Sequence, residues 1–329
     1  KTASIQWTSN TSLINKYEII EGGESGSILR VTLNPNQTGN AIIAFHLGNN
    51  GVWGTSTQDK IMWSWHIWAP QNNIAETTYT TESLANGGVL SVSNASFINP
   101  TKSGTPPLTT TFMDRNLGSV TTFPNTDGFG GSAIASNPNI LGSGGLHYQW
   151  GRKDPIPTFY SPGGVSPMPV FKQISYNNGV IGYSAAINDA AYTTGFTKEY
   201  NTYINDAGVT PNDSKAERSR KTIKYSVENP FYFLYHNRSG AEIYFSGAGT
   251  AQAKSLQIKD WIAPVGNVAN MSERWGHATE KSPYDPCPDG WRVPDLSFST
   301  LLGGFEKGTS PWFFNNYKKN GTYIDYGFY

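Results

Sequence analysis

The chain has 329 residues with 24 Lys and Arg against 24 Asp and Glu, so its formal net charge at pH 7 is zero. This balance argues against nucleic acid or an anionic membrane as a partner, because both attract a basic surface. A single cysteine, Cys287, excludes a disulfide framework and a multi-cysteine zinc site within the chain, and no apolar run approaches the roughly 20 residues of a membrane helix.

Three strands are predicted in the first part of the chain. Residues 28–33 and 41–47 are short, largely apolar runs bounded by Gly, Asn and Pro turn residues. Residues 61–68 alternate with a period of two, and their odd positions are Ile, Trp, Trp and Ile. We therefore expect this third strand to place one wholly apolar face against a core and to end at Pro70.

The middle of the chain is predicted to be irregular. Residues 71–143 are rich in Thr, Asn, Ser and Gly and contain few apolar clusters, with residues 112–117 as the exception. Loops of this length are uncommon inside a compact domain and tend to be functional. The next segment, residues 145–155, is predicted to be a short helix or strand that closes on a glycine turn.

Two helices are predicted in the second half. The first begins near Ser214, because Ser214 and Glu217 have the spacing of a capping box, and it ends before Pro230. The second covers residues 296–302, with Asp295 as its N-cap and two glycines after its last residue.

The sequence contains no motif that specifies catalysis. It lacks a G-x-S-x-G nucleophile elbow, a phosphate-binding loop and an H-E-x-x-H motif. Cys287 lies between two prolines, in a stiff turn and not at the helix N-terminus that would activate its thiol. We expect a buried or tethering cysteine and a protein that is not an enzyme.

Residues that could bind a metal are scattered along the chain. The histidines stand alone, and we expect packed rings whose nitrogens bond to the backbone; they are His46, His66, His147, His236 and His277. The pairs Asp285 with Asp289 and Glu273 with Glu280 could bind calcium or act as acid and base, but solvated, turn-forming carboxylates are the favoured interpretation. No cofactor and no metal is therefore expected.

Aromatic side chains are the main indication of function. The chain has 10 Trp and 18 Tyr, and such rings stack on the apolar faces of sugars while Asn, Asp and Gln bind the hydroxyls. Trp63 and Trp65 are expected to be core residues. The candidates for a ligand-binding surface are tyrosines in irregular segments: Tyr160, Tyr192, Tyr200 and Tyr203.

Four stretches, taken in order, resemble a large family of Bacteroidetes surface proteins that includes fimbrillin-family tip subunits and fimbrial adhesin-like proteins. They are residues 39–44 leading to 63–68, residues 112–118, residues 145–155 (GLHYQWGRKDP) and residues 284–294 (YDPCPDGWRVP). The last stretch is also similar to the major paralogous surface domains, which have a C-type-lectin-like fold.

The resemblance implies an α+β protein that is rich in strands and loops. A small β subdomain over residues 1–75 would precede a C-type-lectin-like domain over residues 76–329. That domain would be incomplete at its C-terminus, because such domains usually continue to a second cysteine. An open sheet edge accepts a strand from another chain, so a missing strand could be supplied in this way.

We assign the motif residues to the fold and not to a ligand site. They are Trp63, Trp65, Trp150, Cys287, Trp291 and Arg292. Arg115 and Arg152 are expected to form buried ion pairs with Asp114, Asp154 or Asp285 that hold loops in place.

The resemblance, the low charge and the aromatic and polar loops together favour a non-catalytic extracellular adhesin or pilus-tip recognition module. It would lie at the cell surface, bind a glycan or a host or bacterial surface protein, and contact other pilus subunits. One alternative is a structural pilus subunit that acts in assembly without its own ligand, and another is a hydrolase of surface polysaccharide. Calcium stays possible, although the sequence has no Glu-Pro-Asn or Gln-Pro-Asp sugar–calcium motif.

Overall fold

The computed structural model describes residues 2–21, 26–47, 59–80, 109–122, 142, 145–149, 151–156, 169–186, 197–235, 261–262, 274–277, 280–293, 318–319 and 322–323. Within these residues the protein is rich in strands, which form small and mostly antiparallel sheets, and helices are few. The chain forms two compact units, residues 1–71 with 146–266 and residues 72–145 with 267–329. The first unit contains most of the N-terminal subdomain predicted over residues 1–75. It also contains residues 146–266, which we predicted to belong to the second domain.

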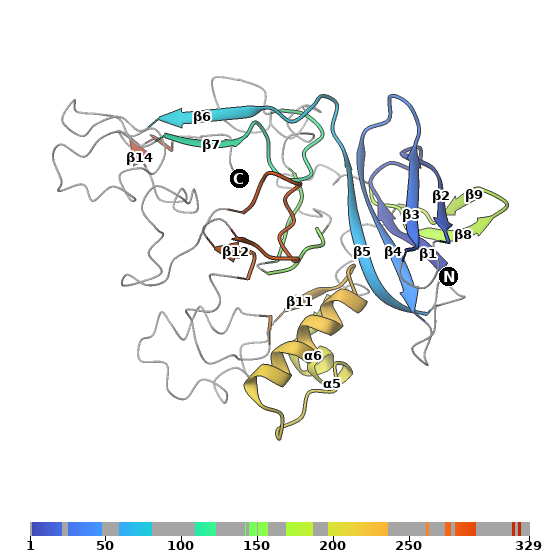
Figure 1. The fold of residues 1–329 in the computed structure, drawn as a ribbon, viewed down its shortest axis with the longest axis vertical. Coiled ribbons are helices and arrows are strands. Elements are labelled where there is room, and N and C mark those ends of the chain that lie inside the picture. The colour runs from blue at the N-terminus through green and yellow to red at the C-terminus, as the bar shows by residue number, and fades with distance from the viewer. Residues whose placement is uncertain are drawn as a thin grey trace. The chain divides into compact units, whose positions relative to one another are not determined.

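The main sheet of the first unit has the strand order β1–β4–β5 (Figure 1). β1 (Thr2–Thr8) and β5 (Lys60–Ala69) both pair antiparallel with β4 (Gly39–Leu47). Side chains of β4 are buried on both faces, which explains an apolar run without alternation. The strands predicted over residues 41–47 and 61–68 are thus confirmed.

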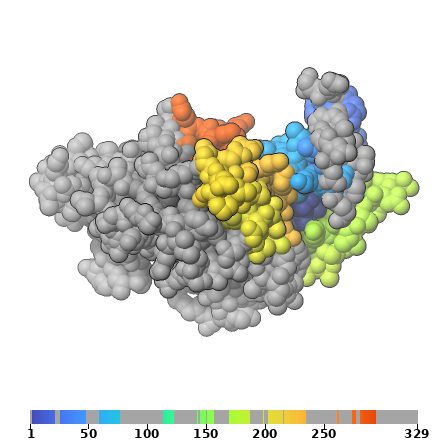
Figure 2. All heavy atoms as spheres, turned by 90° about the horizontal axis from the view of Figure 1, so that it is seen from below, coloured from blue at the N-terminus to red at the C-terminus, as the bar shows by residue number. Residues whose placement is uncertain are grey.

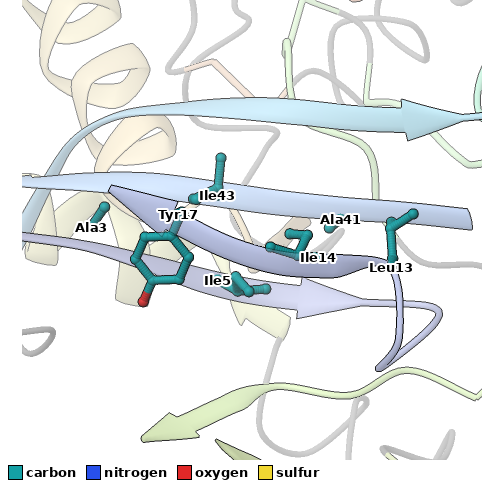
Figure 3. Packing of buried hydrophobic residues seen from close by; sticks show 7 residues of the cluster. All are labelled: Ala3, Ile5, Leu13, Ile14, Tyr17, Ala41 and Ile43. Atoms are coloured by element: carbon teal, nitrogen blue, oxygen red, sulfur yellow. The ribbon is translucent and has the colours of Figure 1, made fainter. Parts of the chain in front are cut away.

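One face of this sheet is covered by two hairpins. β2 (Ile14–Ile20) pairs with β3 (Ile28–Leu33), which confirms the strand predicted at residues 28–33. The core between this hairpin and the sheet contains residues of β1, β2 and β4 and of the turn before β2 (Figure 3): Ala3, Ile5, Leu13, Ile14, Tyr17, Ala41 and Ile43.

The second hairpin joins β8 (Gln173–Asn177) to β9 (Val180–Tyr183) and lies beside β2 (Figure 1). Asn178 and Gly179 connect the strands with φ angles of 48° and 83°. A two-residue type I′ turn requires positive φ at both central residues, and Asn-Gly is the pair that adopts them most readily.

The opposite face of the sheet packs against later segments of the same unit. Trp7 of β1 and Ile42 of β4 form a second core with three residues from those segments, which are Ile156, Val170 and Phe231. These contacts join parts of the chain that are more than a hundred residues apart in sequence.

The helix predicted from the capping box is confirmed as α6 (Lys215–Glu228), which packs beside β5. The Oγ of Ser214 accepts a hydrogen bond from the amide of Glu217 at 3.2 Å, as an N-cap does. The helix ends at Glu228. Asn229 is its C-cap and Pro230 follows, and proline cannot continue a helix.

A third core lies between α6 and its neighbours. Helix α5 (Tyr200–Asp206) precedes α6, and β10 (Thr197–Glu199) pairs parallel with β11 (Phe233–Tyr235). The buried residues of this core are Tyr203, Tyr225, Leu234, Trp261 and Ile262.

The second unit is described in shorter pieces. Its strand pairs are β6 (Glu76–Thr80) with β7 (Thr109–Met113), β12 (Gly276–His277) with β13 (Glu280–Lys281), and β14 (Lys318–Lys319) with β15 (Thr322–Tyr323). The helix predicted at residues 296–302, with its cap Asp295, lies outside the described residues. None of the described helices is long and apolar enough to cross a membrane.

Candidate functional site

Arg152 is the centre of a buried polar cluster in the first unit and is 2% exposed. Its guanidinium donates to the Oε1 of Gln149 at 2.8 Å and to backbone carbonyls at the end of α6. Those carbonyls belong to Ser226 (3.3 Å), Asn229 (3.1 Å), Pro230 (3.3 Å) and Tyr232. The last turn of α6 has no basic residue of its own, so Arg152 supplies both the donors and the positive charge that a helix C-terminus favours.

Gln149 of the same motif fixes β11. Its amide nitrogen donates to the carbonyl of Leu234 at 2.7 Å, and its Oε1 accepts from the Leu234 amide at 3.2 Å. The segment is closed by a β-bridge between His147 and Ile156, and Gly151 has a φ of 87°. The predicted glycine turn is therefore confirmed, whereas the predicted regular helix or strand is replaced by a turn closed by this bridge.

Lys153 and Asp154 bind strand β5 at Ser64. The ammonium of Lys153 lies 2.8 Å from both carboxylate oxygens of Asp154 and donates to the Ser64 carbonyl at 2.8 Å. The Ser64 hydroxyl donates to Asp154 at 2.9 Å, and the ammonium also lies 4.5 Å from the centre of the Trp63 ring. Burial lowers the pKa of Lys153, and the charge of Asp154 opposes that shift.

This cluster has the residue types of a Ser–Lys nucleophile pair but not its geometry. Ser64 is 2% exposed, its hydroxyl hydrogen bonds to a carboxylate, and Lys153 is paired with the same carboxylate. A nucleophilic serine needs a neutral base and access to a substrate. The contacts instead resemble a clamp that ties the strand β5 to residues 152–154.

The ion pairs predicted for the two motif arginines have different outcomes. Arg115 forms a buried pair with Asp114 at 2.7 Å and also donates to the carbonyls of Asn72 and Asn73, as a loop anchor would. For Arg152 the prediction of a pair with Asp154 is wrong, because Asp154 pairs with Lys153 and the guanidinium is directed at α6.

His66 is a packed, neutral histidine in β5. Its Nε2 donates to the Oδ1 of Asn40 at 2.9 Å, so its Nδ1 accepts from the hydroxyl of Tyr148 at 3.2 Å. Burial lowers the pKa of His66 to about 3.

His46 is similarly packed, with its Nδ1 on the carbonyl of Asp59 at 2.8 Å and its Nε2 on the hydroxyl of Ser4 at 2.7 Å. The prediction of packed rings is confirmed for these two histidines, but the predicted bonds to the backbone are found only at the Nδ1 of His46. His147 is exposed, so the prediction is wrong there, and the side chains of His236 and His277 lie outside the described residues.

In the second unit, Asp285 organises the loop that contains the cysteine. Its carboxylate accepts from the amides of Cys287 at 2.8 Å and Val293 at 2.9 Å. Lys281 donates to the carbonyls of Cys287 and Pro288. Cys287 is 8% exposed, and burial followed by the charge of Asp285 raises the pKa of its thiol, which disfavours the reactive thiolate.

The two other motif residues of this loop are partly buried. They are Trp291, whose amide donates to the Pro288 carbonyl at 3.1 Å, and Arg292, which donates to the Val293 carbonyl at 3.0 Å. All these contacts lie within the loop, which agrees with an architectural assignment of the motif.

The structure describes two of the four tyrosines predicted to bind ligand, Tyr200 and Tyr203. Tyr160 and Tyr192 lie outside the described residues, as does the motif residue Trp150, and Tyr200 is the first residue of α5. The surface position predicted for Tyr203 is wrong: the residue is 0% exposed and its hydroxyl donates to the Trp261 carbonyl at 2.8 Å. Its segment is a helix with an inner face, and not the irregular loop that the prediction assumed.

Trp65 is the opposite case, because it was expected in the core and its side chain is 43% exposed. Ile61 pairs with His46 and Trp63 pairs with Phe45, so Met62 is an extra residue in β5. Such a β-bulge shifts the alternation of side chains, and the predicted single apolar face of the strand is broken there. β5 is also an edge strand of its sheet among the described strands.

A second set of exposed apolar side chains lies on the β8–β9 hairpin, whose segment 169–186 stands at the surface in yellow-green in Figure 2. Ile174 is 67% and Val180 is 70% exposed. The hairpin is anchored by Tyr176, whose ring stacks on that of Tyr17 at 4.5 Å and whose hydroxyl donates to the Tyr17 carbonyl at 3.0 Å. Its exposed residues are therefore held by a fixed support.

The described residues contain no group of three or more His, Cys, Asp and Glu side chains placed to hold a metal ion. Comparisons with known proteins add no relative: no family model matches the chain, and no curated protein or solved structure matches it significantly.

Proposed function

We propose that the chain is a non-catalytic recognition module of a cell-surface protein, an adhesin or pilus-tip module that binds a glycan or a surface protein. The proposal includes a C-type-lectin-like domain and other pilus subunits as partners, both on the strength of the family resemblance. One observation carries it: Trp65, a large aromatic ring, is 43% exposed on a strand that is otherwise tightly fixed. An exposed indole on a fixed strand suits a role in binding, because Trp combines a large apolar ring with a polar N–H and is enriched at interfaces.

The architectural roles of the ionisable residues also support this proposal. Arg152, Lys153, Asp154 and Asp285 form hydrogen bonds with backbone groups and with neighbouring side chains. These hydrogen bonds hold strands and loops in place, as a scaffold that presents a binding surface requires.

The second candidate is a structural pilus subunit that acts in assembly. It is favoured by Ile174 and Val180, because exposed aliphatic side chains on a strand suit contact with another protein better than contact with a sugar. Sedimentation of the chain over a range of concentrations checks it: self-association that V180D abolishes would support assembly, and a monomer at all concentrations would count against self-assembly.

A glycan-array screen of the purified, folded chain tests the leading proposal. It is run in calcium and again with a chelator. Selective binding to a few related glycans supports an adhesin, and loss of binding in the chelator would add a metal to the site. A blank array from a protein that unfolds cooperatively would contradict glycan binding and leave a protein ligand or pilus assembly.

A further inference from the structure

Trp63 and Trp65 lie on the same face of β5. They are two residues apart and pair in unbroken register with Phe45 and Ile43 of β4, so the bulge at Met62 does not separate them. Their ring-bearing positions are about 7 Å apart along the strand. Trp63 is partly buried and its ring contacts the Lys153 ammonium, whereas Trp65 presents its ring to solvent.

Both chain neighbours of Trp65 are fixed by side-chain hydrogen bonds. Ser64 before it is tied to Asp154 and Lys153, and His66 after it is tied to Asn40 and Tyr148. The backbone that carries the ring is therefore fixed before a ligand arrives, which lowers the conformational entropy lost on binding.

Within the described sheet, apolar side chains lie beside the Trp65 ring. Its described neighbours on the same face of the sheet are Trp63, Ile67, Ile43 and Phe45, which carry no charge. Lys153 reaches this face at Trp63, but its charge is balanced by Asp154 at 2.8 Å. An acidic sugar would gain no net attraction here, whereas the C–H face of an uncharged pyranose can cover the indole and keep its hydroxyls in water.

We propose that Trp65 is the stacking platform of a binding site for an uncharged sugar residue. The clamp of Ser64, Lys153 and Asp154 keeps the platform in place. This inference rests on the proposed recognition function and names the ligand class for one surface of the module.

The test is titration of the full chain with neutral oligosaccharides of glucose, galactose and mannose, and with uronic-acid oligosaccharides of equal length. Binding is followed by isothermal titration calorimetry and by the indole N–H resonances in NMR, where the missing peak of W65F assigns Trp65. We expect at least one neutral series to bind and to shift the Trp65 resonance. W65A is expected to weaken that binding by about tenfold or more, and W65F to restore most of it. V180A, on the β8–β9 hairpin, is the matched control and is expected to bind as the wild type does.

Three results would overturn the inference. Equal binding by W65A and the wild type would refute Trp65 as the platform while leaving the recognition function intact. Binding of uronic-acid oligosaccharides alone would refute the ligand class. No binding of any sugar by the folded wild type would refute both the site and the glycan form of the proposed function.

Discussion

Arg152 caps helix α6 from a distant part of the chain. It is buried and donates to carbonyls at and beyond the end of α6, from Ser226 to Tyr232. A guanidinium suits this role because its planar fork offers several donors at once, which a lysine ammonium cannot match in the same geometry.

Replacing this residue is expected to be strongly destabilising. R152A should lower the free energy of unfolding by about 3–5 kcal/mol, because it leaves several buried carbonyls without donors, and R152K should recover part of the loss. Denaturant titration measures the effect, and hydrogen exchange of α6 should accelerate in the variant. R220A, an exposed arginine of the same helix, is the control and should change little. Equal effects of R152A and R220A would contradict the capping role.

His66 makes the stability of the first unit depend on pH. Its folded pKa, about 3, is lower than the ordinary value of 6.5, so the unfolded chain binds a proton that the folded chain does not. Stability is therefore fully present above about pH 6.5 and is lost as the pH falls toward 3. By pH 4 this histidine alone should cost about 3 kcal/mol.

H66Q isolates this contribution because it removes the titrating ring and keeps polar atoms in the same place. Unfolding free energies of the wild type and H66Q are compared from pH 4 to pH 8. We expect the wild type to lose more stability than H66Q between pH 6.5 and pH 4. Parallel curves would show that His66 is not buried as a neutral ring.

At the scale of the element, strand β5 is held by backbone pairing and by a buried side-chain cluster. β4 pairs with it along its length, and Lys153 and Asp154 bind Ser64. The cluster thus fixes the strand.

A double-mutant cycle measures this cluster. K153M and D154N should each cost about 3–5 kcal/mol, since each leaves a buried charge without its partner. The double variant should cost less than the sum, with a coupling of about 1–3 kcal/mol. The exposed pair Lys224 and Glu228 of α6, 3.6 Å apart, is the control and should show a coupling below about 0.5 kcal/mol. Additive effects at Lys153 and Asp154 would contradict the clamp.

Elements with local signals could be predicted from the sequence. The strands near residues 28–33, 41–47 and 61–68 and the helix at Ser214 each follow from a pattern of neighbouring residues. The β8–β9 hairpin also has a local signal, the Asn178–Gly179 pair between two apolar runs, which the prediction missed.

Features that depend on distant residues could not be predicted in this way. The bulge at Met62 is visible only against β4, and the exposure of Trp65 depends on which segments cover that part of the strand, so neither could be deduced from alternation alone. The partner of Arg152 lies more than 70 residues away, whereas the nearest carboxylate in sequence, Asp154, is taken by Lys153. Only 15% of the residues in the chain are charged, yet Arg152, Lys153 and Asp154 are consecutive. This run was the feature of the sequence that indicated the cluster.

At the scale of the whole molecule, both units are discontinuous in sequence, which explains why domain boundaries were hard to place. The bridge between Thr8 and Phe171 and the bond between Tyr17 and Gln173 return the later segment to the N-terminal sheet. Order in this unit depends on contacts between segments far apart in the chain. The recognition surface that we propose is built on the same unit.

The most direct test of the account is a side-by-side glycan array of the wild-type chain and W65A, both shown to unfold cooperatively at the same denaturant concentration. We predict that the wild type binds a small group of related neutral glycans and that W65A loses most of this signal. A wild-type array without any selective signal, from folded protein, would contradict glycan recognition by this chain.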